Sequence, residues 1–394
     1  MISNHLFFRK SFSTLSQRIS SQLTPYHNIP DKIISLCDKR LISKPAHPLG
    51  ILSSKIRSFF QDPKVFKSPM QESFPLAYTI KDDFDPIVTI KQNFDDLLIP
   101  LDHISRKKAD TYYLSETQLL RTHTSSHQNE MLKASHNAFC VFGDVYRRDT
   151  IDCSHYPIFH QMEAVRIFNK EQFKIKQDDV IISEVASDLQ RTLESLVKSL
   201  FGDLQMRWVP AYFPFTDPSF ELEIYFNDEW MEMLGCGVIH KDVMKNGNRR
   251  KDEIGWAAGL GLERFAMLLF GINDIRLFWS DDKRFLGQFQ PGKITKFEPF
   301  SKYPICYKDF AFWLPKEGTF EENELCEVVR NIGGDLIEKV NCIDTYEDKK
   351  RHRTSKCFRI FFRSLERTLQ NSEINSLQGK MREDFQKILK LELR

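Results

Sequence analysis

The stretch IFHQMEAVRIF at residues 158–168 decides the fold class, because its side chains alternate as those of a β-strand do. Residues two apart share one face of a strand, so Phe159, Gln161 and Glu163 lie together, opposite the apolar Ile158 and Met162. Other strand-like segments occupy 138–147, 206–215, 220–226 and 230–238. Several are joined by short loops, which favours antiparallel pairing, since parallel neighbours need long crossovers. With helices expected at 116–135, 178–200 and 259–270, the sequence predicts an α+β body around a mainly antiparallel sheet.

The last hundred residues read as a separate module. Gly287, Pro291, Gly292 and Pro299 mark a linker at 288–299. The elements expected after it are a strand at 308–314, a helix at 321–331, strands at 336–346 and 357–363, and a helix at 373–391. This order matches a ferredoxin-like sandwich. We therefore divide the chain into a leader (1–30), a helical and extended region (31–111), the main body (112–287), the linker (288–299) and the C-terminal module (300–394).

Composition narrows the classes of function. The 56 Lys and Arg nearly balance the 54 Asp and Glu of this 394-residue chain, so nucleic-acid binding would depend on local patches. The sequence contains no run of 18 apolar residues, so it predicts no membrane-spanning helix. The eight Cys form no CxxC pair and are expected to be reduced thiols. Walker and Rossmann loops are missing, since GLGLER at 259–264 lacks the third glycine of the dinucleotide motif.

The first 30 residues have the composition of an organellar transit peptide. They contain no Asp or Glu, and Arg9, Lys10 and Arg18 lie among serines and apolar residues. The same charges interrupt every apolar run that a secretory signal would need. We interpret the segment as a mitochondrial leader; a disordered basic tail is the other interpretation.

Two groups of residues could carry chemistry. Arg147 lies in YRRD at the end of a strand, near Phe159, where its guanidinium could bind phosphate oxygens in pairs. Glu221 and Glu223 share a face of one strand, and a turn at Asn227 to Glu229 would bring Glu232 beside them. Clustered carboxylates are costly without a cation, so Mg²⁺ held together with phosphate oxygens is expected there.

Five ordered segments resemble those of the class II aminoacyl-tRNA synthetases, and within them the single-chain organellar phenylalanyl enzymes. YRRD at 146–149 with HYPIFHQME at 155–163, and GLGLERFAM at 259–267, resemble the family's motifs 2 and 3. The segments that resemble phenylalanine-specific ones are LLRTHTSSHQ (119–128), YFPFTDPSFELEI (212–224) and EWMEMLGCG (229–237). The resemblance implies an antiparallel sheet flanked by helices, followed by a ferredoxin-fold anticodon-binding domain. It also implies a monomer that joins phenylalanine to tRNA(Phe) in the mitochondrial matrix.

The resemblance assigns roles to residues of this chain. Arg147 would bind the α-phosphate of ATP and then the transition state, and Arg264 would clamp the far phosphate and hold adenine against Phe159. His155 would lie in the loop that closes over ATP. The residues expected near Mg²⁺ are Glu232, Asp217 and Glu221. The residues expected around phenylalanine are His123, Ser125, Ser126, His127, Gln128, Gln161, Glu163, Phe213, Phe215, Ala257 and Ala258.

Three expectations stay open at this stage. Ala258 stands where relatives commonly have an aromatic residue, so either another Phe fills the space or Ala258→Phe would sharpen the choice of phenylalanine over tyrosine. A stretch without acids is expected to contact tRNA phosphates through Lys349, Lys350, Arg351, Arg353, Lys356 and Arg359. The rival functions are a catalytically silent relative that binds RNA or a partner protein, and a class II enzyme for another amino acid.

Overall fold

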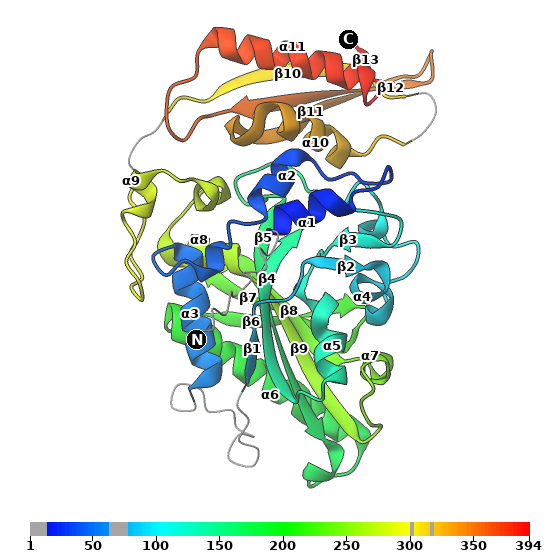
Figure 1. Cartoon of the computed structure of the whole chain (residues 1–394), viewed down its shortest axis with the longest axis vertical. Helices are drawn as coiled ribbons and strands as arrows, with labels where there is room; N and C mark the ends of the chain where they lie inside the picture. The colour runs from blue at the N-terminus through cyan, green and yellow to red at the C-terminus, as the bar shows by residue number, and fades with distance from the viewer. Residues whose placement is uncertain (1–13, 63–77, 300–302, 316–318) are drawn as a thin grey trace, which may run out of the picture.

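The computed structural model describes residues 14–62, 78–299, 303–315 and 319–394, which form a large body and a smaller C-terminal domain (Figure 1). A seven-stranded sheet in the order β1-β4-β5-β9-β8-β7-β6 organises the body. Its strands are β1 (Thr79–Lys81), β4 (Ala138–Tyr146), β5 (Ile158–Asn169), β6 (Met206–Phe213), β7 (Thr216–Phe226), β8 (Glu229–Ile239) and β9 (Glu253–Gly261). Only β1 runs parallel to its neighbour, so the predicted α+β body with a mainly antiparallel sheet is confirmed.

Helices cover the sheet and leave part of one face open. The α-helices of the body are α1 (Leu15–Gln22), α2 (Asp31–Leu36), α3 (Pro48–Gln61), α4 (Ile90–Asn93), α5 (Gln128–Lys133), α6 (Asp178–Phe201), α7 (Lys241–Asn246), α8 (Leu262–Phe270) and α9 (Lys283–Leu286). Met162 and Ala164 of β5 pack into the main apolar core with residues of α3, α6 and α8. Gln161 and Glu163 point to the other face, where a cavity opens. The side-chain alternation predicted for 158–168 is therefore confirmed.

Two expected helices differ from the structure. The segment 116–135 contains a short strand, β3 (Gln118–Leu120), which pairs with β2 (Ile87–Thr89), then a 3₁₀ turn (Thr124–His127) and α5. The expected helix at 259–270 is the end of β9 followed by α8. The sequence did not predict a strand at 253–261, because the Gly and Ala residues of this segment have low β-propensity. The central position of β9, between β5 and β8, overrides that preference.

The hairpin of β7 and β8 forms as predicted. Asn227 and Asp228 have positive φ angles of 51° and 65°, which a tight turn between twisted strands requires and which Asn and Asp tolerate. The pairing sets Glu232 opposite Glu223.

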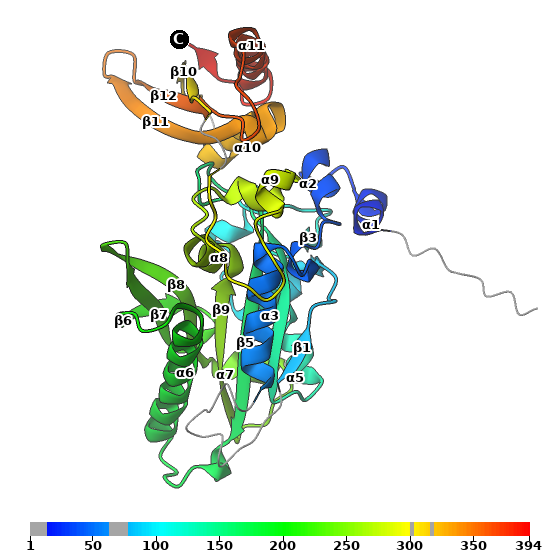
Figure 2. The same ribbon diagram turned by 90° about the vertical axis from the view of Figure 1, so that its left-hand side faces the viewer.

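The C-terminal domain has the predicted ferredoxin-like order. Its elements are β10 (Cys306–Trp313), α10 (Glu322–Gly333), β11 (Ile337–Asp348), β12 (Arg353–Phe362), α11 (Asn371–Lys387) and β13 (Glu392–Leu393), and its sheet runs β11-β12-β10-β13. Figure 2 shows that α10 lies on the side of the C-terminal domain that faces the body. A buried polar cluster joins the two domains: Tyr112 donates to Glu327 (2.9 Å), and Arg330 donates to Glu327 (2.9 Å) and to the Asp149 carbonyl (2.7 Å).

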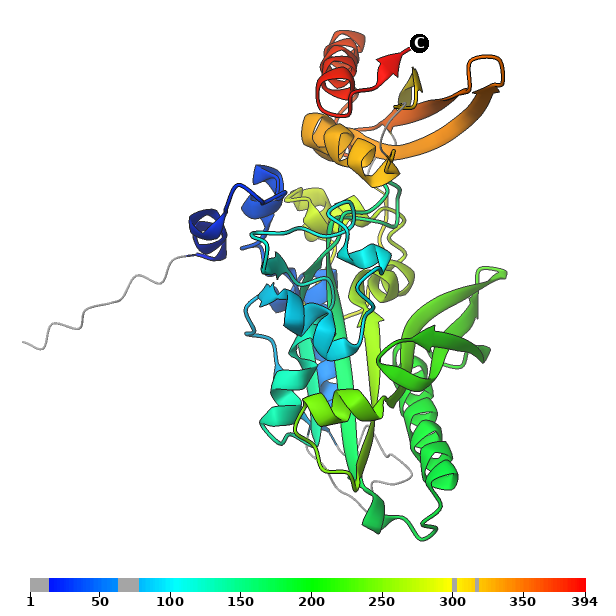
Figure 3. The ribbon, with the colours of Figure 1, turned by 90° about the vertical axis from the view of Figure 1, so that its right-hand side faces the viewer.

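The predicted leader overlaps a folded helix. Residues 1–13 lie outside the described part, but the helix α1 that follows them (Figure 3) begins at Leu15. Its Ile19 is completely buried, and its Arg18 pairs with Asp85 (2.7 Å). No helix in the described ranges is long and apolar enough to cross a membrane. All eight Cys lie in those ranges as free thiols.

Candidate active site

A cavity of about 710 Å³ opens on the face of the sheet that carries Gln161 and Glu163. Its size is that of a small-molecule site. Most of the predicted site residues line it, namely His123, Ser125, Arg147, His155, Phe159, Gln161, Glu163, Phe213, Phe215, Glu221, Glu232, Ala257, Ala258 and Arg264. The structure therefore brings together residues that are up to 141 positions apart, from His123 to Arg264.

Arg147 is a partly buried cation that the backbone holds in place. It follows β4, its Nε donates to the Thr122 carbonyl (2.8 Å), and its guanidinium carbon lies 5.1 Å from the centre of the Phe159 ring. Burial lowers the pKa of Arg147, and the charge of nearby Asp149 opposes this shift. The site thus holds a desolvated positive charge, which suits an anionic ligand.

Glu163 lies deep in the cavity wall with His123 and Ser125 nearby. Burial raises the pKa of Glu163 to about 8, and a hydrogen bond from Ser125 acts in the opposite direction. Its Oε2 atom is buried and has no hydrogen-bond partner among the described residues. Burial and the charge of Arg147 lower the pKa of His123 to about 3, so the imidazole is neutral. A ligand ammonium beside Glu163 would give this carboxylate the cation that it lacks.

Two aromatic rings and three glycines shape the apolar end of the cavity. The rings of Phe213 and Phe215 are stacked, with centroids 5.8 Å apart. Gly235 leaves room for Phe213, because a Cβ there would lie 2.8 Å from that ring. Gly259 and Gly261 of β9 pair with Glu163 and Gln161, and a Cβ on either would meet open space. These glycines keep the floor flat and the cavity wide.

The two alanines of β9 face opposite sides of the sheet. Ala257 packs in the cluster that includes Val165 and touches Phe215, whereas Ala258 belongs to the main core with Met162 and Cys236. Both border the cavity. The side chain of residue 258 therefore points into the core, which does not support the expectation that Ala258→Phe would sharpen the choice of phenylalanine over tyrosine.

A matched pair of variants tests this assignment. We expect Ala257→Val to raise the KM for phenylalanine about tenfold, because two added methyl groups occupy space that the ligand ring needs. The KM for ATP should not change. Ala258→Val should lower the melting temperature through overpacking of the core without changing the ratio of the two KM values. Amino-acid-dependent ATP–pyrophosphate exchange measures both constants; equal effects of the two variants on the phenylalanine KM would contradict the assignment.

Arg264 and two carboxylates form the far end of the cavity. The Arg264 guanidinium donates to the Glu232 carbonyl (2.7 Å) and lies 3.4 Å from the Glu232 carboxylate. Burial and the charges of Glu232 and Glu223 raise the pKa of Glu221. Asp217 is exposed and does not line the cavity, so its expected place near the metal is not supported by the structure. In the described part of the chain no three His, Cys, Asp or Glu side chains converge as a metal site.

The loop between β4 and β5 carries His155 to the cavity mouth. His155 Nδ1 bonds to the Asp152 carboxylate (2.7 Å), and this contact raises the pKa of the imidazole. The same loop contacts the C-terminal domain, where Arg148 lies 3.5 Å from Glu327. Both arginines border the cavity, but Arg148 is engaged at the domain interface, so Arg147 is the one assigned to a phosphate.

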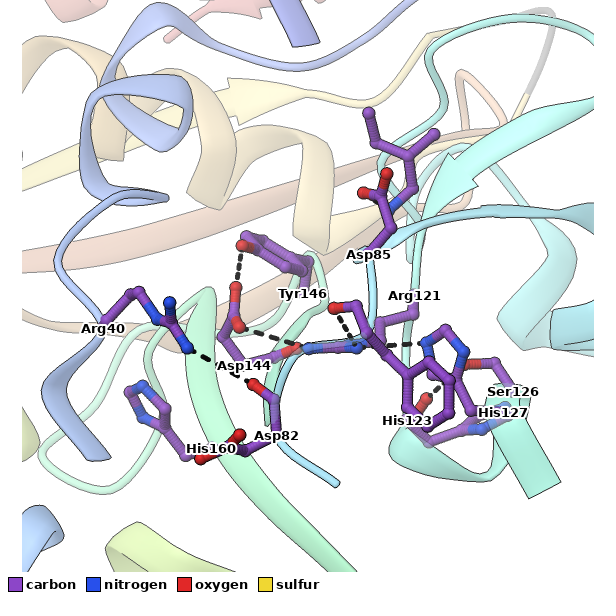
Figure 4. Close-up of polar contacts among 12 residues, drawn as sticks. Arg40, Asp82, Asp85, Arg121, His123, Ser126, His127, Asp144, Tyr146 and His160 are labelled. Carbon is purple, nitrogen blue, oxygen red and sulfur yellow. Dashed lines mark hydrogen bonds and ion pairs between the residues drawn. The ribbon is translucent and has the colours of Figure 1, made fainter. Parts of the chain in front are cut away.

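Three expected ligand residues lie outside the cavity wall: Ser126, His127 and Gln128. His127 instead stacks on Phe84, with 4.5 Å between the ring centroids. Its Nε2 accepts from Arg121 (3.1 Å), and Ser126 donates to the His123 carbonyl (Figure 4). Burial and Arg121 lower the pKa of His127 to about 3, which keeps the ring neutral. These residues support the segment that carries His123 and Ser125.

Arg121 is a buried residue that the sequence did not single out. Its guanidinium donates to the Asp144 carbonyl (2.7 Å) and side chain (3.2 Å), which links the phenylalanine-side segment to β4 (Figure 4). A Cβ at Gly143 would lie 2.1 Å from Arg121 Nη2, so only glycine leaves room for this contact. No pattern in the sequence distinguishes Arg121 from an exposed arginine.

The predicted tRNA-contacting residues divide into three places. Lys349, Lys350 and Arg351 lie at the exposed turn between β11 and β12. Arg353 pairs with Glu392, and Arg359 pairs with Asp309 (2.7 Å), both on the open face of the C-terminal sheet. Lys356 lies on the opposite face, 5.5 Å above the Phe320 ring. The six residues therefore do not form one continuous basic surface.

The open face of that sheet is rich in aromatic side chains. Arg359 stacks over Tyr307 (4.3 Å), and Arg353 stacks over Trp313 (4.8 Å). Arg394 lies over both Trp313 (5.4 Å) and Tyr346 (5.2 Å). Tyr307 and Tyr346 are about half exposed, so a planar ligand could reach them.

The sequence of this chain is similar to known proteins over nearly its whole length. Residues 69–289 match the tRNA synthetases class II core domain (F), and residues 301–394 match the ferredoxin-fold anticodon binding domain. The chain is 49% identical over 371 residues to the chloroplastic/mitochondrial phenylalanine–tRNA ligase of Arabidopsis thaliana, covering 94% of this chain and 83% of that protein.

Relatives from animals and fungi give the same result. The mitochondrial phenylalanine–tRNA ligase of Mus musculus is 45% identical, covering 93% of this chain and 85% of that protein. The enzyme of the same name from Saccharomyces cerevisiae is 39% identical, covering 93% of this chain and 92% of that protein. The two domain matches follow the order of the two domains in the structure, and the similarity covers most of each relative's length. The chain therefore belongs to the phenylalanine–tRNA ligase family of class II tRNA synthetases.

Proposed function

We propose that this protein uses ATP to attach phenylalanine to tRNA(Phe) through a phenylalanyl adenylate. One observation carries the proposal: a single cavity has Arg147 and Arg264 toward one end, Phe213 and Phe215 at the other, and Glu163 in its wall. Arginines suit a triphosphate, stacked aromatic rings suit a benzyl side chain, and a lone buried carboxylate suits an ammonium group.

The first step needs positioning and charge, and no side-chain base. The carboxylate of phenylalanine attacks the α-phosphorus of ATP, the bond to the β-phosphate oxygen breaks, and pyrophosphate leaves. Arg147 stabilises the charge that grows on the α-phosphate oxygens. Arg264 holds the far phosphate and one face of adenine, and Phe159 lies against the other face. In the second step the 2′-OH of the terminal adenosine attacks the acyl carbon and AMP leaves.

Glu221 and Glu232 fit a magnesium ion. They lie on neighbouring strands and both line the cavity near Arg264. Mg²⁺ is usually held by one or two carboxylates together with substrate phosphates, so two carboxylates suffice. Bound there, the ion would offset negative charge on the pyrophosphate. Burial and, after it, the like charges of Glu232 and Glu223 raise the pKa of Glu221, and a bound cation would favour its charged form.

The open face of the C-terminal sheet is the surface we assign to tRNA. Single-stranded RNA is bound by bases stacked on aromatic rings and arginine planes, with cations on the phosphates. Tyr307, Trp313 and Tyr346 provide the rings, and the turn at Lys349 to Arg351 adds exposed positive charge. This replaces the hypothesis of a purely basic loop.

Variants on the two faces of that sheet test the assignment. Tyr346→Ala is expected to raise the KM for tRNA roughly tenfold or more, because stacking of one base on an aromatic ring contributes about 1–3 kcal/mol. Lys356→Ala, on the other face, should leave it unchanged. Amino-acid activation without tRNA should be normal in both. An unchanged KM for Tyr346→Ala, or an equal rise for Lys356→Ala, would remove the open face from the tRNA interface.

We further propose that the protein works as a monomer in the mitochondrial matrix. The names of the relatives support the mitochondrion, and the acid-free segment at the N-terminus supports import.

The decisive experiment is ATP–pyrophosphate exchange with each of the twenty amino acids. We expect exchange with phenylalanine alone at low concentration. Exchange with none would favour the catalytically silent relative, and preference for another amino acid would favour a different class II specificity.

A further inference from the structure

A buried pair of hydrogen bonds between a carboxylate and a histidine connects the two structural elements that we assign to ATP binding. The Glu263 carboxylate accepts from the backbone N–H of His160 (2.8 Å) and from its ring Nδ1 (2.7 Å). Both residues are almost fully buried. His160 directly follows Phe159 in β5, and Glu263 directly precedes Arg264 in α8. One contact therefore joins the neighbours of the two side chains assigned to adenine.

The contact has two hydrogen bonds, and so it fixes orientation as well as distance. One bond holds the β5 backbone at residue 160 and the other holds the His160 ring. That ring also stacks on Trp279, with centroids 5.8 Å apart and planes 20° apart. With the ring and backbone both fixed, Phe159 must project from the opposite face of β5. On the other side of the pair, Arg264 is the next residue along α8 after Glu263, whose carboxylate is held by His160.

Arg264 itself is not held this way. Arg264 is exposed, and it contacts the carbonyl and the carboxylate of Glu232. Glu232 is also assigned to the metal, so it must share its interactions when substrate binds. The position of the Arg264 backbone is then set by α8. Glu263, in the first turn of α8, holds this helix against β5 through its hydrogen bonds to His160.

We propose that Glu263 and His160 are a positioning pair that sets the spacing between Arg264 and Phe159, and thereby the affinity for ATP. The inference rests on the proposed ATP site. Neither residue is assigned a catalytic role: His160 does not line the cavity, and Glu263 borders it, but both of its carboxylate oxygens accept hydrogen bonds from His160. The pair should affect the binding of ATP and leave the binding of phenylalanine unchanged, since His123, Ser125 and Glu163 are held by other contacts.

Two substitutions of His160 separate the hydrogen bond from the aromatic stack. Asparagine places an N–H donor near the position of Nδ1 and removes the ring, whereas phenylalanine keeps a ring against Trp279 and removes the donor. The probes are ATP with Mg²⁺ in the absence of amino acid, and phenylalanine alone, each titrated by calorimetry against the full chain. We expect His160→Phe to raise the Kd for ATP about tenfold more than His160→Asn does, because a charge-assisted hydrogen bond is lost. The Kd for phenylalanine should stay within about twofold.

A second comparison covers the case in which His160→Phe does not fold. Glu263→Gln retains one acceptor and loses the charge, and Glu253→Gln alters a pair with Arg249 (2.9 Å) at the other end of β9, away from the cavity. Glu263→Gln should weaken ATP binding and Glu253→Gln should not.

The outcomes are distinct. The proposal is overturned if His160→Asn and His160→Phe weaken ATP binding equally, or if the Kd values for ATP and phenylalanine rise together, as they would for a general loss of structure. It is also overturned if Glu263→Gln binds ATP as the natural protein does. Failure of the natural protein to bind ATP or to support exchange would instead reject the proposed function.

Discussion

Arg147→Met should reduce phenylalanine-dependent ATP–pyrophosphate exchange by about 10³-fold, because the loss removes a preorganised charge from a dry transition state. Methionine keeps most of the apolar stem against Phe159. Stability should be maintained or should rise, since the guanidinium is partly buried and burial lowers its pKa. A large loss of activity with an unchanged or higher melting temperature is the expected combination.

The control for this variant is Arg207→Met. Arg207 pairs with Glu223 and stacks over Trp230 (4.3 Å) on β6, and it does not line the cavity. Exchange by Arg207→Met should stay within about threefold of the natural protein, as for surface changes that spare the site. Near-normal exchange by Arg147→Met would reject the role of Arg147, and a low melting temperature would show that its charge supports the fold.

The fold could be predicted where local pattern and tertiary role agree. Phe159, Gln161 and Glu163 were placed on one face by alternation alone, and all three line the cavity. The C-terminal module was predicted from element order, because each of its helices and strands carries its own apolar pattern. The turn at Asn227 and Asp228 was also recognisable, since these residues tolerate the positive φ that it needs.

The sequence could not show β9, for a reason that belongs to function. Gly259 and Gly261 have no neighbour within 4 Å of a hypothetical Cβ, because the space above them belongs to the cavity. A strand that must leave room for ligand loses the β-branched residues by which strands are recognised. The two glycines, two positions apart, were the available signal, but we assigned them to the start of a helix and to motif 3.

Charge partners were equally hidden from the sequence. The stretch from Lys349 to Arg359 contains no acid, so its arginines looked unpaired. Asp309 and Glu392 reach Arg359 and Arg353 from strands that are distant in sequence. Composition gives the charge of a segment, whereas pairing depends on which strands become neighbours. Strand alternation also determines on which face of the sheet Lys356 lies, but only once the bounds of β12 are known.

Glu163 determines how phenylalanine binding should depend on pH. In the free protein burial raises its pKa to about 8, so at pH 7 the carboxyl is mostly protonated and neutral. A bound ammonium group favours the charged carboxylate and lowers that pKa. Binding must therefore release a proton below pH 8, and affinity should increase as pH rises toward 8.

We expect about 0.9 proton to be released per phenylalanine at pH 7, given the free-state pKa of about 8, and the apparent Kd to fall roughly tenfold from pH 6 to pH 7. Calorimetry in buffers of different ionisation enthalpy counts the protons. Glu163→Gln cannot ionise, so it should release none, show no such pH dependence, and bind about 10- to 100-fold more weakly at pH 8. Ser125→Ala is the companion variant: its hydroxyl lowers the pKa of Glu163, so removing it should move the midpoint of proton release to higher pH. Proton release that persists in Glu163→Gln would assign the ionisation to another group, and no release by the natural protein at pH 7 would mean that Glu163 is already charged before the ligand arrives.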